Sequence, residues 1–496
     1  MCMRITNNMM RNNAMLNIQK NKVAYNKYFE QYASQKKIQK PSDNPTIAVR
    51  ALKYRTTLVE IDQYLTNCDD AESWMDATEE PMKNANNILD SMIDYVTQAA
   101  NGTNNDDDRA TIAEQLREYA GFIYEQNANM DYAGRYLFTG YRTDVPFLFE
   151  GIQNDTTYTI TENLTINEIQ KYSYVYGQAV YGDAKSAADY ANEASEFLEA
   201  HRILVSYNNC DAEDVTITYN DVDGNTHTVT AVTKSISENI AYNEQYHPGE
   251  DEVYFVPETG ELVFGENIYN SVRAGSDLSV QYKKTEFKDK DIRPEHYFNC
   301  VAENNATGVT KNYDRVTEQQ INYQVNFSQT LTVNTLGCNA FDTSIGRVID
   351  DIYNVINDLE VTEQKLESIQ KRIDDCDPND AEMMANLKEL YAQTETQLTL
   401  QNTVLTNSYG HAITVFQDAK DTLNVAVADH GARYNRLKMT QSKLETLEMD
   451  TDEAKSENED ADLEEAYANY TEADLLYQAS LQATSKVLGT SLLDFI

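Results

Sequence analysis

Seven-residue apolar periodicity in the second half of the chain limits what this sequence can fold into. From residue 347 onward the sequence holds a single proline, Pro378, and only three glycines. Apolar residues recur every seven positions at residues 345–373 and 384–426, and this spacing places them on one helix face. The second series predicts a helix over residues 381–449, on the order of 100 Å long. Such a helix cannot be buried in one compact globule, so the sequence predicts a helical rod.

The first 150 residues carry the same periodicity. Ile61 and Val96 begin and end an unbroken series in a helix predicted over residues 46–100, and Pro81 inside it should kink the helix or mark a joint. Another series, from Leu116 to Leu137, predicts a further helix that ends in the glycine- and aromatic-rich residues 134–141, which predict a hairpin or a tight corner. The seam of the rod is predicted to draw on both halves of the chain, through Ile61, Met75, Leu89, Val96, Ile352, Leu359, Leu366, Leu398 and Leu405.

Residues 151–340 differ in character and predict a β-rich inserted domain. Alternating runs flank turn residues at positions 221–225 and 257–260, which predicts two hairpins. A short helix is expected near residues 185–204. The predicted fold class is therefore mainly α with a β-rich inserted domain.

The predicted organisation is nested. Residues 1–45 and 451–496 form paired terminal helices, and residues 46–150 and 341–450 form the helical rod domain. Residues 151–340 form the inserted outer domain. One coiled-coil-like rod is thus built from both chain ends.

The last 35 residues carry more apolar surface than a lone helix can bury. Leu463, Tyr470 and Tyr477 recur every seven residues, while Ala466 and Ala473 lie on a second side. This helix needs a partner from its own chain, from other subunits, or from both. Residues 1–35 show a weaker amphipathic pattern. The predicted assembly interface of the two terminal helices comprises Ile5, Met9, Leu16, Val23, Leu463, Tyr467, Tyr470, Tyr477, Leu481 and Leu488.

The charge of the chain is strongly negative and unevenly placed. Its formal net charge of −41 argues against a nucleic-acid partner. Residues 1–55 nevertheless hold eleven Lys or Arg and two acids, whereas residues 448–496 hold thirteen Asp or Glu and two lysines. Opposite charges at the two ends predict that the termini lie side by side. The alternative is a basic arm for anionic lipid or nucleic acid.

Motifs of catalysis and metal binding do not emerge from the sequence. The six cysteines are scattered, and no Cys/His cluster has zinc spacing. The chain lacks a nucleophile elbow, a phosphate-binding loop and a zinc-protease motif. We therefore predict no enzyme, no catalytic residue, no metal and no cofactor. No window approaches the about 20 apolar residues of a membrane span, and no cleaved signal peptide is expected.

Ordered motifs in residues 1–150 and 341–496 carry a specific family resemblance. These are MRITNNMM at 3–10, KPSDNP at 40–45, DAESWMDATE at 70–79, QAANGT at 98–103, GRYLFTG at 134–140, GARYNRL at 431–437 and SLLDFI at 491–496. They resemble the hook-associated protein 3 family, the hook–filament junction proteins of the flagellin superfamily. The middle of the chain contains no motif of this kind.

The resemblance implies a structural protein of the bacterial flagellum. In such a protein the terminal helices form the inner layer of a tubular polymer, and the inserted domain faces outward. The implied partners are copies of itself in a helical or ring assembly, the first hook-associated protein, flagellin, and an export chaperone at the C-terminal helix. The implied location is extracellular, reached by flagellar type III export.

Two alternatives belong to other functional classes or positions. Flagellin itself would have the same architecture but would form a filament of its own. An adhesin or glycan-binding module could reside in the 151–340 insert. Filament formation by the purified protein alone would favour flagellin over a junction protein. Glycan binding by the isolated insert would favour an adhesin or glycan-binding role.

Overall fold

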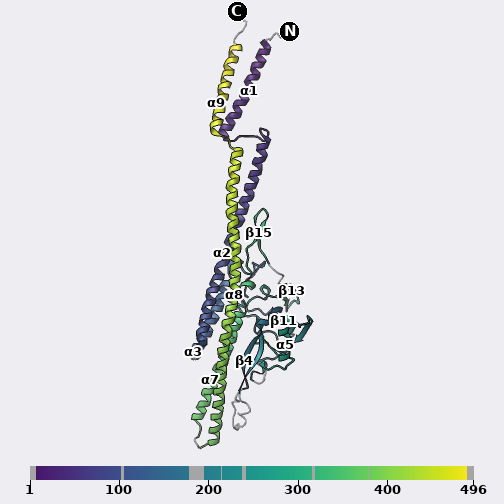
Figure 1. The fold of residues 1–496 in the computed structure, drawn as a ribbon, viewed down its shortest axis with the longest axis vertical. Coiled ribbons are helices and arrows are strands. Elements are labelled where there is room, and N and C mark those ends of the chain that lie inside the picture. Colours follow the sequence, from purple (N-terminus) through teal and green to yellow (C-terminus); the bar gives the residue numbers. More distant parts are fainter. Residues whose placement is uncertain are drawn as a thin grey trace, which may run out of the picture. The chain divides into compact units, whose positions relative to one another are not determined.

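Long helices from both ends of the chain flank a β-rich central region, which confirms the predicted fold class (Figure 1). The computed structural model describes residues 7–101, 106–177, 195–213, 215–236, 242–314, 319–377 and 379–488. The chain divides into two compact units. The first comprises residues 1–71, 323–331 and 435–496, and the second comprises residues 72–322 and 332–434. Helices α2 (Pro45–Asn101) and α8 (Ala381–Glu459) contribute to both units.

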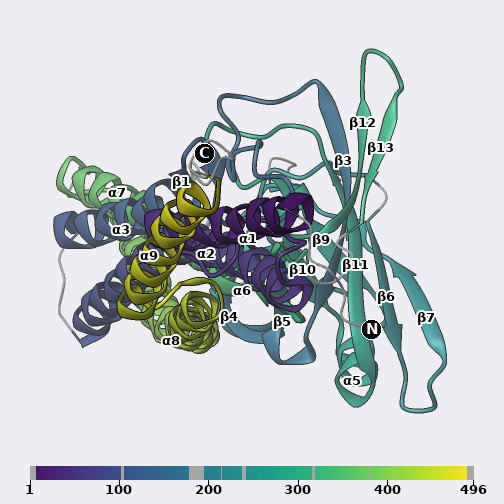
Figure 2. The ribbon, with the colours of Figure 1, turned by 90° about the horizontal axis from the view of Figure 1, so that it is seen from above.

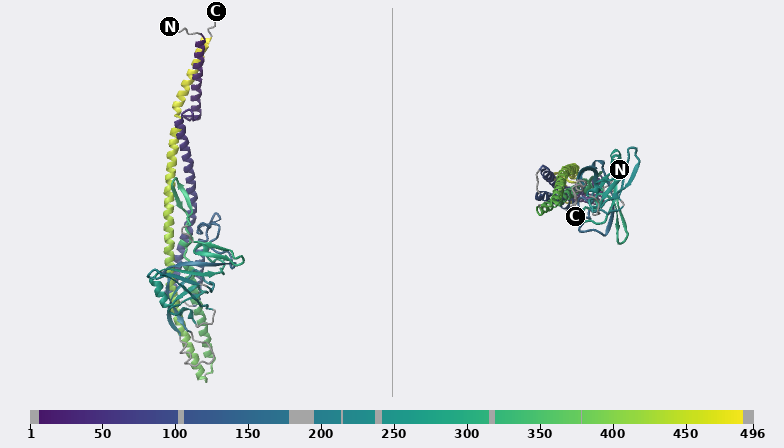
Figure 3. Two further views of the ribbon diagram at one scale, coloured as in Figure 1. Left: turned by 90° about the vertical axis from the view of Figure 1, so that its right-hand side faces the viewer. Right: turned by 90° about the horizontal axis from the view of Figure 1, so that it is seen from below.

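The first unit is built from helices, with the tip of one hairpin against them. Helix α1 (Asn7–Ser34) lies beside α9 (Leu463–Leu488), as the purple and yellow helices of Figure 3 show. The early part of α2 and the late part of α8 belong to the same unit. The hairpin of β14 (Asn322–Asn326) and β15 (Gln329–Thr332) places Phe327 against Tyr64 of α2, with ring centroids 5.1 Å apart.

The helical part of the second unit combines α2 and α8 with α3 (Asp106–Gly121) and α7 (Ser344–Asp374). Pro81 does not divide α2 into two helices, because α2 continues through it without interruption. Of the nine predicted seam residues across the chain, seven are buried, whereas Leu366 and Leu398 are half-buried. Their burial follows from the seven-residue spacing, and their role in an assembled rod stays a prediction.

The helix predicted to carry Leu116 to Leu137 ends earlier than expected, at Ala128, whereas the hairpin or tight corner predicted around Gly134 is confirmed. Helix α3 is followed by a π-helix, η1 (Phe122–Ala128), and then by the short strands β1 (Asp131–Tyr132) and β2 (Arg135–Tyr136). Gly134 adopts a φ of +76° in the turn between these strands, a conformation that favours glycine. Leu137 is buried, but from the corner after β2 and not from a helix.

The β-rich region contains two main sheets, both largely antiparallel. The six-stranded sheet has the order β13-β12-β3-β11-β6-β7, and the five-stranded sheet has the order β4-β5-β10-β9-β8. Figure 2 shows β3, β11, β6 and β7 as neighbours. The strands are β3 (Thr156–Leu164), β4 (Gln170–Tyr176), β5 (Glu196–Leu204), β6 (Thr216–Asn220), β7 (Thr226–Thr230), β8 (Val232–Thr233), β9 (Val253–Val256), β10 (Glu261–Phe264), β11 (Ser276–Lys284), β12 (Asn299–Asn304) and β13 (Thr310–Tyr313). Short helices lie between these strands, namely η2 (Ile166–Glu168), η3 (Glu244–Tyr246), α5 (Glu266–Ala274) and η4 (Pro294–His296), and a further one, α6 (Gly337–Ala340), lies between β15 and α7.

Both sheets contribute to one apolar core. Ile160 and Val280 come from the six-stranded sheet, and Phe255 and Leu262 come from the five-stranded sheet. The two predicted hairpins are confirmed as β6–β7 and β9–β10. The helix expected near residues 185–204 is wrong where the structure describes it, because residues 196–204 form β5, paired with β4 and β10. The earlier part of that prediction lies outside the described residues.

Candidate assembly surface

The two terminal helices, α1 and α9, pack antiparallel along a seam of aromatic rings. Tyr470 of α9 lies against Tyr25, Phe29 and Tyr32 of α1, at centroid distances of 5.6, 5.9 and 5.9 Å. Tyr477 extends the seam by stacking on Tyr25 at 5.7 Å. Because aromatic pairs at 4.5–7 Å attract one another beyond simple burial, these contacts hold the two helices in one register.

Small side chains complete the contact on the α9 side. Ala466, Ala473 and Thr484 are buried, although α9 is otherwise mostly exposed. Asn21 of α1 donates a hydrogen bond from Nδ2 to the carbonyl oxygen of Leu476, at 3.3 Å. The second apolar side predicted for this helix therefore supplies part of its contact with α1.

The predicted interface residues lie mainly outside this contact. Met9, Leu16 and Val23 of α1 are 50%, 53% and 68% exposed. On α9, Tyr470 and Tyr477 are half-buried in the seam, whereas the other described members are exposed, namely Leu463, Tyr467 and Leu481. Ile5 and the side chain of Leu488 lie outside the described residues. The pair of helices therefore leaves apolar surface open on both of its members.

A compact ionic cluster lies where each terminal helix meets the next long helix. We refer to residues 35–45 and 457–461 as the joint. Arg55 of α2 holds the carboxylate of Glu459 with two hydrogen bonds, Nε to Oε1 at 2.9 Å and Nη2 to Oε2 at 2.6 Å. Lys36 lies 2.5 Å from Asp460 and 3.6 Å from Glu459. The Arg55–Glu459 pair is bidentate, and bidentate ion pairs fix the relative orientation of the two side chains in addition to neutralising their charges.

The ionic cluster changes the acidity of its members. Hydrogen bonds from Arg55 lower the pKa of Glu459, whose side chain is only 4% exposed. The hydrogen bond from Lys36 lowers the pKa of Asp460, and Asp460 in turn raises the pKa of Lys36. Both carboxylates are therefore held in their charged form at neutral pH.

Backbone hydrogen bonds pair the two chain segments of the joint, residues 35–45 and residues 457–461. Lys36 and Asp460 form an antiparallel bridge, flanked by hydrogen bonds from Lys37 N to Glu459 O at 2.7 Å and from Ala461 N to Gln35 O at 2.9 Å. Within the KPSDNP motif, Asp43 accepts hydrogen bonds from the amides of residues 39 and 40. Asn44 accepts one from Thr46 N at 3.1 Å, which caps the start of α2.

The terminal charges are placed side by side, as the charge count predicted. Within the described residues, however, the ion pairs that join the basic N-terminal segment to the acidic C-terminal segment lie at the joint. The seam between α1 and α9 is aromatic instead. The sequence indicated the partners but not which residues make the contact, because the pairing of Tyr25 and Tyr32 with α9 depends on a register that periodicity alone does not determine.

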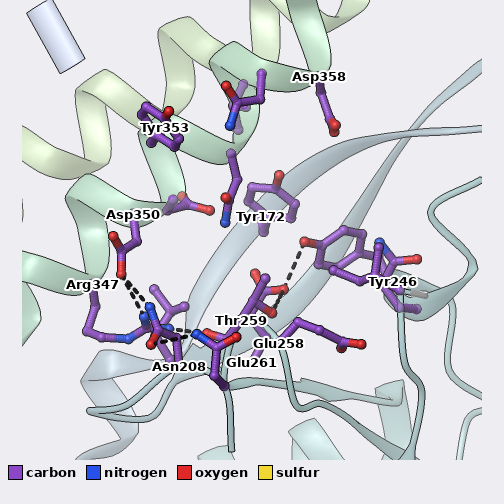
Figure 4. A pocket seen from close by; sticks show the side chains of 18 of the residues that line it. Tyr172, Asn208, Tyr246, Glu258, Thr259, Glu261, Arg347, Asp350, Tyr353 and Asp358 are labelled. Atoms are coloured by element: carbon purple, nitrogen blue, oxygen red, sulfur yellow. Dashed lines mark hydrogen bonds and ion pairs between the residues drawn. The ribbon is translucent and has the colours of Figure 1, made fainter. Parts of the chain in front are cut away.

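A polar pocket of about 600 Å³ lies between α7 and the strands of the insert, within the second unit (Figure 4). Beside it, buried Arg202 of β5 pairs with Glu261 of β10 and, at 2.7 Å, with Asp351 of α7. Tyr246 donates a hydrogen bond to Glu261 at 2.9 Å. Burial raises the pKa of Asp358, farther along α7, to about 6.

The polar groups around this pocket are largely bonded to one another. Arg347 of α7 donates from Nε to Val205 O at 3.0 Å and pairs with Asp350 at 3.2 Å. Asn208 also donates to Asp350, at 2.8 Å. The network therefore fixes the insert to α7, a role that no sequence motif indicated. Among the described residues, no group of three His, Cys, Asp or Glu side chains is placed to hold a metal ion, and no helix is long and apolar enough to cross a membrane.

Helices from the two ends of the chain pair with one another, and a β-rich region lies between them in sequence. Residues 5–143 match the bacterial flagellin N-terminal helical region, and residues 413–496 match the bacterial flagellin C-terminal helical region. Both terminal regions of the chain are therefore similar to those of bacterial flagellin.

Two curated relatives are each named flagellar hook-associated protein 3. The protein of Escherichia coli (strain K12) is 28% identical over 146 residues, and that of Salmonella typhimurium (strain LT2) is 29% identical over 146 residues. Each match covers 29% of this chain and 46% of the relative, so the chain spans about half the length of the curated relatives it matches.

Solved structures with similar chains carry related names. A putative flagellar hook-associated protein from Vibrio parahaemolyticus is 13% identical, with a TM-score of 0.35, over 84% of this chain and 100% of that one. FlgL from Xanthomonas campestris is 12% identical, with a TM-score of 0.32, over 81% of this chain and 99% of that one. Because these TM-scores are low, the similarity to flagellin rests on the sequence matches of the two terminal regions.

Proposed function

We propose that this chain is a structural subunit of the bacterial flagellum that joins the hook-associated proteins at the hook tip to the flagellin filament. The observation that carries the proposal is the terminal helix pair, which belongs to regions matching flagellin and leaves apolar stripes exposed. Exposed apolar stripes on paired helices are surfaces for further helices. The name of the curated relatives supports the junction position.

The proposal assigns a separate role to each part of the chain. Residues 1–45 and 451–496 form the inner layer of the assembly, where the open faces of α1 and α9 meet neighbouring subunits. Residues 46–150 and 341–450 form the surrounding rod layer. Residues 151–340 face outward, which suits a β-rich core that is already closed by its own two sheets.

The partners follow from the junction position. They are other copies of this chain, the first hook-associated protein on one side and flagellin on the other. Before assembly, an export chaperone covers the exposed residues of α9, and the chain reaches the outside through flagellar type III export. The role is structural and involves no catalysis.

Immuno-electron microscopy of isolated flagella tests the proposal. An antibody against the insert should label the boundary between hook and filament, at one position per flagellum. Labelling along the whole filament would favour flagellin and refute the junction role. Spontaneous growth of long filaments by the purified chain alone would also favour flagellin and refute the junction role.

A control variant makes the test specific to the terminal helices. Removal of the residues after Asp462 should abolish incorporation at the hook tip, because α9 supplies half of the terminal helix pair. The circular dichroism of the remaining chain should retain its β signal, since the insert core contains no residue of α9. Normal incorporation of the shortened chain would contradict the proposed route of assembly.

A further inference from the structure

A groove of about 810 Å³ runs between α2 and α8 in the first unit. Its apolar residues are Leu58, Val59 and Met449, of which Val59 is 70% and Met449 is 65% exposed. Single exposed apolar residues are ordinary on a protein surface, but here they line one continuous depression. The residues that line this acidic groove are Leu58, Val59, Asp62, Glu448, Met449, Asp452, Glu453, Ser456 and Glu457.

Acidic side chains surround the apolar residues. Five of the nine lining residues are Asp or Glu. Among the described residues, Asp452 has an ion pair, with Lys455 at 2.7 Å, and the structure gives none for the other four. Like charges this close repel one another, so the groove favours a cationic occupant with an apolar face.

Helix α1 carries a surface of that kind. Met9, Leu16 and Val23 are exposed and seven residues apart, and Lys20 and Lys27 each follow an apolar member by four residues. Residues at these spacings share one helix face. The contacts of α1 with α9 involve other positions, such as Tyr25 and Tyr32. We call the five residues Met9, Leu16, Lys20, Val23 and Lys27 the basic stripe.

Among the described residues, the lysines of the basic stripe form no ion pair with the acidic side chains of α9. The described ion pairs between the two chain ends involve Lys36 and Arg55, both outside α1. Lys27 lies 5.9 Å from the ring centroid of its neighbour Tyr28, and its charge helps to lower the pKa of Asp43. Within the part of the chain that the structure describes, neither Lys20 nor Lys27 forms an ion pair, so both ammonium groups can pair with a carboxylate of a partner.

We propose that the acidic groove of one copy receives the basic stripe of α1 from a second copy. The proposal rests on the proposed function, because it names the contact by which one subunit holds the next. The dimensions agree: residues 448–457 span about 14 Å of helix, and Lys20 to Lys27 span about 10 Å. Leu16 and Val23 then cover Val59 and Met449, while the two lysines face the acids.

The geometry of this contact also fits a growing assembly. Groove and stripe are different surfaces of the same chain, so the contact is head-to-tail rather than self-complementary. Head-to-tail contacts generate rings or open helical arrays, according to whether the rotation closes. The groove and the stripe of every subunit can thus be filled by two different neighbours.

Charge reversal of the full-length chain tests the proposal. One variant carries Lys20→Glu and Lys27→Glu, and the other carries Glu448→Lys and Glu453→Lys. Self-association of the unaltered chain and of each variant is measured by sedimentation velocity at low ionic strength. Because exposed ion pairs are individually weak, each variant should associate on the order of tenfold more weakly than the unaltered chain.

Mixing the two variants is the decisive measurement. In a one-to-one mixture the basic groove of one variant meets the acidic stripe of the other, so association should return toward that of the unaltered chain. A contact within one chain would not be restored by mixing. The matched control, Lys53→Glu with Lys443→Glu, changes two exposed charges away from the groove and should associate like the unaltered chain.

Each result has a defined meaning. Restored association in the mixture, suppressed by salt as the Debye length shrinks to about 8 Å, supports the proposal. Absent self-association of the unaltered chain, or variants that associate normally, would overturn it. Binding of the groove to a basic peptide without copy–copy association would show a different occupant and also overturn it. Circular dichroism confirms that each variant is folded.

The two proposals can fail separately. If immuno-electron microscopy labels the hook tip while charge reversal leaves association unchanged, the junction role stands and the groove contact is wrong. If mixing restores association but the hook tip is not labelled, the contact stands and the junction role is wrong.

Discussion

Tyr470 is the residue on which the aromatic seam between α1 and α9 depends most. It lies against Tyr25, Phe29 and Tyr32, whereas the exposed Tyr467 lies against Tyr32 alone, at 5.6 Å. An aromatic pair contributes about 0.5–1.5 kcal/mol, and half-exposed pairs fall at the lower end. The substitution Tyr470→Ala should therefore destabilise the terminal helix pair by about 1.5 kcal/mol, and Tyr467→Ala by about 0.5 kcal/mol.

Native-state hydrogen exchange measures this difference directly. With 1.4 kcal/mol equal to a factor of ten, the opening equilibrium of the pair should rise about tenfold in Tyr470→Ala and about twofold in Tyr467→Ala. The readout is the exchange of α1 amides, because the substitutions are in α9 and leave the intrinsic helix propensity of α1 unchanged. Both variants replace the same residue type in the same helix, so Tyr467→Ala is a matched control.

Equal effects of the two substitutions on α1 would refute the reasoning, since they would show that the ring contacts of Tyr470 do not hold the helices together. The absolute protection is informative as well. Helices of 26–28 residues are marginal alone, so strong protection of α9 in a monomer would mean that the pair needs no further partner. That result would weaken the case for assembly through its open faces.

Three further predictions concern the joint, the insert and the open face of α1. Because the folded pKa of Glu459 is lowered, its contribution to stability is present above its unfolded pKa of about 4.3 and is lost as pH falls through the folded value. Arg55→Met should thus lower the free energy of unfolding in urea by about 1 kcal/mol at pH 7, a value that allows for the exposure of Arg55. The difference from the unaltered chain should vanish near pH 2. A loss of stability that does not depend on pH would contradict the ion-pair explanation. Arg202→Met leaves two buried carboxylates without their cation and should destabilise the second unit by about 3–5 kcal/mol in urea unfolding. Replacing both carboxylates by amides in the same variant should recover part of this loss. A destabilisation below about 1 kcal/mol would argue that the ion pairs do not hold the insert to α7. Val23→Asp should leave thermal stability within about 0.5 kcal/mol but reduce incorporation at the hook tip, whereas Val222→Asp, at a position 74% exposed in a hairpin turn of the insert, should not; equal incorporation of both would contradict the role of the α1 face.

The long helices were predictable because the buried face of a helix recurs at a fixed residue spacing, which is visible in the sequence as apolar periodicity. Ile61, Met75 and Ile352 are fully buried at the spacing that the series required. The hairpin at residues 221–225 was predictable for a local reason, since Asp221 bonds the amides of residues 223 and 225 within the turn.

The errors arose where distant partners decide local structure. Residues 196–204 contain good helix formers, but pairing with β4 and β10 on both sides makes them a strand. The series ending at Leu137 kept its spacing by coincidence, because a π-helix and a hairpin interrupt it after Gly121. Arg202 could not be predicted as an ion-pair centre, since its partners are 59 and 149 residues away in sequence.

The joint has a mechanical consequence for the role proposed above, in which the subunit transmits load along a filament. Two segments of backbone cross it, one after Ser34 and one after Glu459, and the Lys36–Asp460 bridge couples them at the same level. A single connecting strand would act as a swivel, because rotation about its bonds lets one side turn without the other. Two coupled strands resist such turning, since they would have to wind around each other. Torque applied to the long helices is therefore passed on to the terminal pair instead of being lost as free rotation.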